Sequence, residues 1–175
     1  MKKTLCLLMV ALLMTVAFGA SAEKVKLNTS ASGFEVELTL PEGAVITSTQ
    51  AVGDNTITVV SKEGVAPVRI VIAPSELYDN TQSLVDLSDE EKAELLQMVC
   101  EQYENPLSEI ETTPSGNQHY MIDTNAESDL HIIFTLYKGY FFELTQWHED
   151  YATLVEADMT FHHAIAEGLW VVAAE

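Results

Sequence analysis

The segment DTNAESD places an oxygen-bearing side chain at every second position, at Asp123, Asn125, Glu127 and Asp129. Calcium takes about six to eight oxygen ligands, and such a spacing matches the first four ligand positions of a calcium loop. The rest of the template fails, because the sixth position is Ser128 instead of glycine and the twelfth is Phe134 instead of glutamate. We interpret the segment as a turn between two strands, and a divalent-metal-binding protein stays an alternative.

Histidine is the residue type that could most readily bind a metal or move a proton, and the chain has five, at His119, His131, His148, His162 and His163. None pairs with another at the four-residue interval of a helical zinc motif with glutamate between them. Adjacent His162 and His163 would point about 100° apart on one helix, so they cannot chelate one ion together. We interpret His162 as a packed core residue whose ring N–H is held by Asp158 one turn earlier.

The segment WHEDY places three polar residues, His148, Glu149 and Asp150, where the last sheet strand leads into the final helix. Loops of this kind often carry function. The structural interpretation is that Asp150 caps the helix. The alternative is that His148 and a neighbouring carboxylate form a general base or a metal site, as in a hydrolase or a metal-dependent enzyme.

Nucleophilic catalysis has little support in the sequence. No serine lies in a GxSxG motif, and no glycine-rich loop follows a strand to hold a phosphate. Cys100 has no identifiable histidine partner, and we interpret it as a buried, inert thiol. It is also the only cysteine beyond residue 22, so no internal disulfide can form. These absences favour a non-catalytic protein without a cofactor.

The first 22 residues have the pattern of a secretory leader. Lys2 and Lys3 precede an apolar run from Leu5 to Phe18, which ends at the small residues ASA. We expect cleavage after Ala22 and no stable membrane span afterwards, because the run is short for a spanning helix. Residues 23–175 are enough for a single domain. Whether the leader is removed or kept as an anchor stays open.

The chain is strongly acidic. It has 27 acidic and 8 basic residues, a formal charge of −19, and loss of the two leader lysines would make it −21. Such a surface repels phosphate backbones, which excludes nucleic acid, and it disfavours anionic lipids. A cationic protein partner, a small ligand or a divalent ion remains.

Period-two alternation predicts most of the chain to be strand. In FEVELTLPEG, the apolar residues Phe34, Val36, Leu38 and Leu40 share one face, and Pro41 ends the run. Further strands are predicted near residues 25–28, 56–61, 68–73, 108–112, 118–122, 130–137 and 140–146. The last two should form a tight hairpin, because Gly139 in YKGY can adopt a positive φ.

Two segments have helical periodicity instead. Ser88 and Glu91 have capping-box spacing, and apolar residues then recur at helical intervals, at Leu95, Leu96, Val99 and Tyr103. The opposite face, with Glu90, Glu94 and Glu101, should be solvated. A second helix is predicted from about Asp150 to Leu169. This order of elements predicts an α+β fold in which a lone, mainly antiparallel β-sheet packs against two main helices.

Two stretches, FEVELTLPEG and TLYKGYFFELT followed by a long closing helix, resemble the first and last parts of PsbP-like domains, which include DcrB-like exported bacterial proteins. The resemblance covers most of residues 30–170 and implies an α/β/α sandwich. It departs at Ala44 and Val45, where the family often has an aromatic residue. Family members mostly act as binding or assembly accessories without catalysis, and the matching pattern carries over no functional residue.

The sequence therefore favours an exported bacterial, non-catalytic accessory or binding protein with an acidic surface. The partner would be an unknown protein or small ligand, possibly cationic.

Overall fold

The computed structural model describes residues 23–27, 34–103, 109–112, 119–122, 130–148 and 153–173. Its strands are β1 Lys24–Leu27, β2 Phe34–Thr39, β3 Ala44–Val52, β4 Asn55–Lys62, β5 Val68–Pro74, β6 Glu109–Thr112, β7 His119–Ile122, β8 Leu130–Tyr137, β9 Tyr140–Trp147 and β10 Leu169–Ala173. Its helices are the short 3₁₀ helix η1 Leu84–Asp86, α2 Asp89–Tyr103 and α3 Glu156–Gly168. The predicted α+β class is confirmed.

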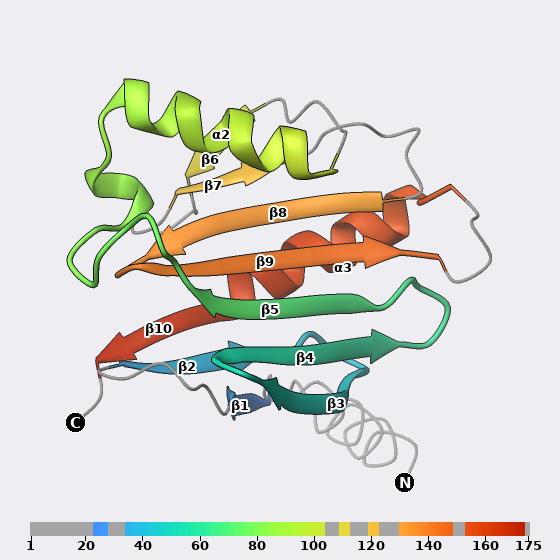
Figure 1. Ribbon diagram of the computed structural model, residues 1–175. Helices are drawn as coiled ribbons and strands as arrows, with labels where there is room; N and C mark the ends of the chain where they lie inside the picture. Colours follow the sequence, from blue (N-terminus) through green and yellow to red (C-terminus); the bar gives the residue numbers. More distant parts are fainter. Residues whose placement is uncertain are drawn as a thin grey trace, which may run out of the picture.

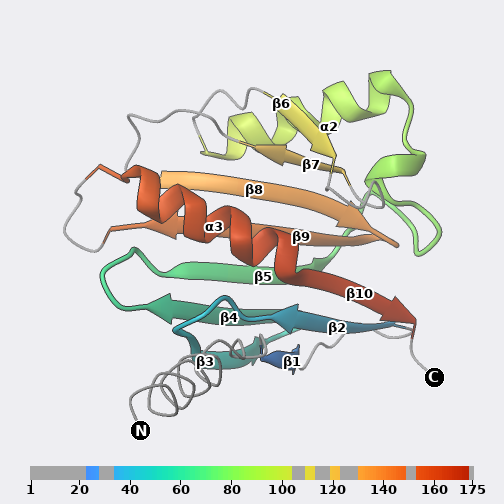
Figure 2. The same cartoon turned by 180° about the vertical axis from the view of Figure 1, so that it is seen from behind.

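The strands form two antiparallel sheets instead of the single sheet that the sequence predicted. The larger has seven strands in the order β3-β4-β5-β9-β8-β7-β6, and the smaller has three in the order β1-β2-β10. Helix α2 covers one face of the large sheet at its β6–β8 end (Figure 1). Helix α3 and the small sheet lie on the other face (Figure 2). Each face of the large sheet therefore borders its own core.

The larger core lies between the large sheet, the small sheet and α3. The alternation predicted for β2 is confirmed, because Val36 and Leu38 are fully buried and Leu40 nearly so. The side chain of Phe34 lies outside the described residues. The other principal members of this core are Ile70, Ile72, Ile133, Phe142, Leu144, Phe161 and Ile165. Residues from both sheets meet here, so this core connects them.

The smaller core lies under α2. It consists of Leu84, Leu87, Leu95, Val99, Phe134 and Leu136. The predicted capping box begins α2, because the amide N–H of Glu91 donates to Ser88 Oγ (3.3 Å) and the amide N–H of Ser88 donates to Glu91 Oε2 (2.7 Å). The predicted solvated face is also confirmed, since Glu90, Glu94 and Glu101 are exposed. Cys100, which was predicted to be buried, is only half-buried and packs against the edge of this core.

The hairpin between β8 and β9 has the two-residue turn predicted from YKGY. Lys138 and Gly139 have φ values of 46° and 72°, and Tyr137 pairs with Tyr140. A Cβ atom at Gly139 would lie 2.5 Å from the carbonyl oxygen of Asp79, so only glycine fits between the turn and the loop before η1. The Gly139 amide donates to the Gln82 carbonyl at 2.9 Å, which fixes this loop against the hairpin.

Strand β3 was not predicted, and its outward residues explain why. Most of the strand is exposed, including its central residues from Thr47 to Gln50. Its register also shifts between Ile46 and Ser48, where a β-bulge interrupts the alternation. Neither half of the strand therefore shows enough regular alternation to be recognised.

The last helix begins later than predicted, whereas its end agrees with the predicted end within one residue. It begins at Glu156, with Val155 as its N-cap, so Asp150 is not the capping residue. It ends at Gly168, where a Cβ atom would lie 2.4 Å from the Thr39 carbonyl oxygen of β2. The chain then continues as β10, which pairs with β2. A pairing between segments so far apart has no local signal.

Candidate functional site

Asp158, in the first turn of α3, links three segments of the chain through one buried carboxylate. Its side chain is about 1% exposed. Oδ1 accepts a hydrogen bond from the Ala66 amide in the β4–β5 loop (2.7 Å), and Oδ2 accepts one from the Val155 amide (2.8 Å). Oδ2 also lies 3.0 Å from Nε2 of His148, which follows β9. The carboxylate thereby fixes the N-terminal end of α3 to the ends of β5 and β9, two inner strands of the large sheet.

The charge state of Asp158 follows from these contacts. Burial raises the pKa of this carboxyl group, but the hydrogen bonds from Ala66, Val155 and His148 outweigh burial, so the net pKa is lowered. The group is therefore ionised at neutral pH.

His148 is the predicted site residue that the structure places most clearly. Its side chain is 29% exposed, and its Nε2 meets Asp158, which the sequence had not assigned to it. A buried carboxylate that orients a half-exposed imidazole is an arrangement found in general-base catalysis. Glu149 and Asp150, the other two members of the predicted trio, lie outside the described residues. So do the predicted calcium ligands, Asp123, Asn125, Glu127 and Asp129.

A second polar contact lies deeper, between α3 and β8. Nδ1 of His162 is 2.8 Å from Nδ1 of His131, and the two rings meet edge to face. His162 is fully buried and His131 nearly so. One Nδ1 must donate and the other accept. The predicted packed position of His162 is confirmed, whereas the predicted partner is wrong, because Asp158 is engaged by His148 and His162 by His131.

Burial strongly disfavours a charge at His162. Burial is the main cause that lowers the pKa of His162 well below its ordinary value of 6.5, and the positive charges of His131 and His163 act in the same direction. The Leu144 backbone acts in the opposite direction and is outweighed. We therefore assign His162 the neutral form at neutral pH.

The polar cluster under α3 extends to Gln146, which pairs with His131 across β8 and β9. Its side-chain amide donates to the Ala66 carbonyl at 3.0 Å. Its Oε1 and the Nε2 of His162 are buried without a hydrogen-bond partner among the described residues. Buried polar groups normally have partners, so this cluster holds α3 less favourably than a fully satisfied one would.

Within the described part of the chain, the other histidines add no metal centre to this cluster. The ring of His163 lies 5.7 Å from that of His131, centroid to centroid, and the side chain of His119 lies outside the described residues. Among the residues that the structure describes, no three histidine, cysteine or acidic side chains are grouped closely enough to hold an ion.

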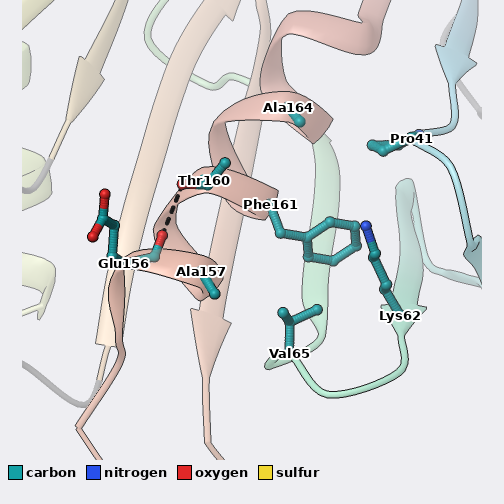
Figure 3. Close-up of a pocket in the computed structure, with 8 residues that line it drawn as sticks. All are labelled: Pro41, Lys62, Val65, Glu156, Ala157, Thr160, Phe161 and Ala164. Carbon is teal, nitrogen blue, oxygen red and sulfur yellow. Dashed lines mark hydrogen bonds between the residues drawn. The ribbon is translucent and has the colours of Figure 1, made fainter.

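A groove of about 490 Å³ runs beside α3, between this helix and the ends of β2 and β4. Its apolar lining is Pro41, Val65, Ala157, Phe161 and Ala164, and its polar lining is Lys62, Glu156 and Thr160. Figure 3 shows the Lys62 side chain reaching toward the ring of Phe161, across the groove from the helix. Thr160 Oγ1 donates to the Glu156 carbonyl at 2.8 Å, so that hydroxyl is engaged by the helix itself.

Lys62 is the unusual member of this lining. It is exposed, and no carboxylate among the described residues lies within ion-pair distance of its ammonium group. By contrast, Arg69 pairs with Glu143 and Lys26 with Glu35. An uncompensated cation beside an apolar surface can accept the acidic group of an amphipathic molecule.

The sequence did not predict this groove. Its lining comes from three separate parts of the chain, and neither Lys62 nor Phe161 has a local motif. The Asp158–His148 contact was missed for the same reason, although Asp158 on the apolar side of a helix was a usable sign of a buried carboxylate.

Comparison with known proteins adds no assignment. No family model matches the chain, and no curated protein matches it at a significant level. In the described part of the chain, no helix has the length and apolar character needed to cross a membrane.

Proposed function

We propose that the protein is an exported, non-catalytic accessory or binding protein, and that the groove beside α3 is its binding site. The observation that carries this proposal is the contrast between two sets of polar residues. The buried ionisable groups are engaged in hydrogen bonds that hold α3 in place, whereas Lys62 faces an apolar groove and has no counter-ion among the described residues.

The lining suggests an amphipathic ligand with one acidic group. The apolar part would lie against Val65 and Phe161, and the acidic group would pair with Lys62. The groove volume falls within the range of about 300–1,000 Å³ that is common for small-molecule sites. Because the chain carries a formal charge of −19, it repels an anion at long range, and the local contact with Lys62 must supply the attraction and the selectivity.

The test uses 1-octanesulfonate, an eight-carbon chain with a permanently ionised head group, followed by amide NMR shifts. We expect shifts at residues lining the groove, and about a tenfold weaker affinity in Lys62→Gln, the loss typical of one charge-assisted hydrogen bond. Lys92→Gln on α2, at the opposite face of the sheet, is the matched control. Binding that is unchanged in Lys62→Gln, or shifts that fall elsewhere, would refute this site.

The acidic surface also fits a cationic protein partner, which could engage the protein outside the groove. Affinity for such a partner should fall as salt is added, because exposed charges are screened. An affinity that does not change with ionic strength would count against a cationic protein partner.

Export is a separate part of the proposal, and rests on the leader pattern of residues 1–22. Production of the full chain in a bacterium with a secretion system, followed by N-terminal sequencing of the exported protein, tests it. A mature chain that starts at Glu23 is expected. The resemblance to PsbP-like domains, whose members mostly act as accessories, is consistent with an accessory role. Membership of that family is itself part of the proposal.

The contact between His148 and Asp158 favours one alternative, a hydrolase or metal-dependent enzyme that uses His148 with a neighbouring carboxylate. Such an enzyme should lose its activity on ester or peptide substrates in His148→Ala while remaining folded. If wild type and His148→Ala are equally inactive and bind metal equally, this alternative is excluded.

A further inference from the structure

Strand β3 forms one edge of the large sheet and lies at the lower border of that sheet in Figure 1. Among the described strands, it pairs with β4 alone. Its nine residues, Ala44–Val52, include no charged residue and no proline. Residues 47–52 are all exposed, and Val52 at the end of the strand is 52% exposed. The strand therefore presents a long, uncharged edge.

The other edge strands differ from β3 in charge or in length. An edge strand has unpaired backbone N–H and C=O groups, and proteins commonly protect such an edge with charges, with proline, with a bulge or with a short length. The sequence of β6 has two glutamates among its four residues, and that of β1 has two lysines among its four. The remaining edge, β10, has only five residues. In β3 the only such protection is the β-bulge between Ile46 and Ser48, which leaves residues 48–52 as a regular edge.

We propose that residues 48–52 of β3 pair antiparallel with the same residues of a second copy of the chain, so that two large sheets join edge to edge in a two-fold symmetric dimer. Such an interface uses the same surface on both copies. It lies on a different part of the molecule from the groove lining of α3, so the inference goes beyond the proposed binding role and does not depend on it.

The charge of the chain favours a second copy over a cationic partner at this edge. The chain has 27 acidic residues, but none of them lies in β3, so a cationic protein would find no carboxylate along the strand. Two copies that each carry a formal charge of −19 repel each other. This repulsion is least where the surfaces that meet have no charge, and β3 is such a surface.

A two-fold axis at Gln50 uses the regular part of the edge and keeps the bulge outside the paired segment. The axis reverses the order of the five residues in the second copy. The opposed pairs are then Ser48 with Val52, Thr49 with Ala51, and Gln50 with Gln50. The pairing connects the outward backbone groups of both copies and covers Val52.

The charges that flank β3 also favour this axis. Glu42 precedes the strand and Asp54 follows it, and both are exposed. An axis at Ser48 would bring Glu42 near Asp54 of the second copy. The axis at Gln50 separates them by about four residues, or about 13 Å, which exceeds the Debye length of about 8 Å at physiological salt. The pairing therefore forms without opposed carboxylates.

Sedimentation of the purified protein at increasing concentration tests the dimer. Five residues from each copy form a small interface, so we expect a dissociation constant of about 10–1,000 μM. Amide NMR shifts that depend on protein concentration should fall on residues 48–52 and leave α2 unchanged. A protein that stays monomeric at about 1 mM would overturn the inference and leave the edge to a strand of another protein. Association that does not shift the amides of residues 48–52 would overturn it as well.

A pair of charge variants tests the axis at Gln50. In Gln50→Glu, and separately in Gln50→Lys, like charges would lie opposite each other, and we expect about fivefold weaker dimerisation in each variant alone. An equal mixture of the two variants should dimerise at least as well as the wild type, because opposite charges then meet. The matched controls are Gln97→Glu and Gln97→Lys on the exposed face of α2, which change the net charge equally and should have no effect. Equal effects at the two positions, or no recovery in the mixture, would refute the pairing.

Cross-linking gives a second test of the same axis. In Cys100→Ser/Gln50→Cys, the two opposed thiols would lie on facing residues of neighbouring strands, whose Cβ atoms are about 5 Å apart and close to the spacing of a disulfide. Mild oxidation should link this variant into a covalent dimer much faster than Cys100→Ser/Gln97→Cys. Equal rates of cross-linking in the two variants would show random collision and contradict the proposed dimer.

Discussion

The two faces of the large sheet hold their helices by different means. Under α2, the core is a small set of apolar side chains, and the polar contacts of the helix lie at its solvated first turn. Under α3, the apolar core is larger, but a carboxylate and two imidazoles lie inside it. One face is therefore stabilised mainly by packing, and the other by packing together with buried polar contacts.

This difference predicts where pH can act. On the α2 side, the phenol of Tyr78 has a raised pKa because of burial and the nearby Glu91 and Glu94 carboxylates, so it stays neutral in acid. On the α3 side, Asp158 and His162 both have lowered pKa values. Acid should therefore weaken the contacts of α3 before those of α2.

The largest effect is expected from Asp158→Ala. The substitution leaves the amides of Ala66 and Val155 without their acceptor and removes the partner of His148. Breaking a buried charged contact of this kind costs about 3–5 kcal/mol, which urea denaturation can measure. Asp86→Ala is the control, because that carboxylate is exposed and accepts a hydrogen bond from the Ser83 amide on the α2 side. Equal losses in the two variants would contradict the proposed difference between the faces.

A second substitution, Leu95→Ala, tests the apolar side. Leu95 is about 1% exposed in the core under α2, and truncating a buried leucine costs about 2–5 kcal/mol. The loss should be the same from about pH 5 to pH 8, because no ionisable group is removed. A loss that grows as the pH falls would mean that the two faces are coupled electrostatically.

The packing under α2 was the more predictable of the two. The capping box of Ser88 and Glu91 lies within one helical turn, and the spacing of Leu95 and Val99 gives the buried face directly. The alternation of β2 and the YKGY turn are local signals as well. Each of these features depends on residues fewer than about ten positions apart, which is the range in which periodicity operates.

The polar contacts under α3 could not be predicted in the same way. His131 and His162 are 31 residues apart, and Ala66 and Asp158 are 92 apart. The pairing of β10 with β2, which creates the second sheet, spans most of the described chain. The candidate site depends on these long-range contacts, so the sequence indicated the residue types that would matter without indicating their partners.

The pH dependence of global stability is the third prediction. His162 has a folded-state pKa below its unfolded value of 6.5, so its contribution is fully present above about pH 6.5 and is lost as the pH falls below it. The slope should approach about 1.4 kcal/mol per pH unit for one proton. Asp158 also has a lowered pKa, so a second loss should begin below the ordinary carboxyl value of 3.8. Urea denaturation at a series of pH values between about pH 3 and pH 8 measures the loss of unfolding free energy in both pH ranges.

A control variant separates the two ranges. His131→Asn/His162→Asn should remove the loss near pH 6 and keep the loss below about pH 4. Stability that does not vary between about pH 5 and pH 8 in the wild type would contradict a buried neutral His162.

The smallest effect is expected from Ser88→Ala at the start of α2. The serine hydroxyl accepts from the Glu91 amide, and loss of such an N-cap costs about 1 kcal/mol. Ser88→Thr keeps the acceptor and should be close to the wild type. The hydrogen bonds from Ser88 lower the pKa of the Glu91 carboxyl group below its ordinary value of 4.5, so Glu91 is ionised at both about pH 5 and pH 7.5 and the loss should be the same at the two. If Ser88→Ala instead weakened the protein mainly in acid, the stability of α2 would depend on titrating groups, and the contrast between the two faces would fail.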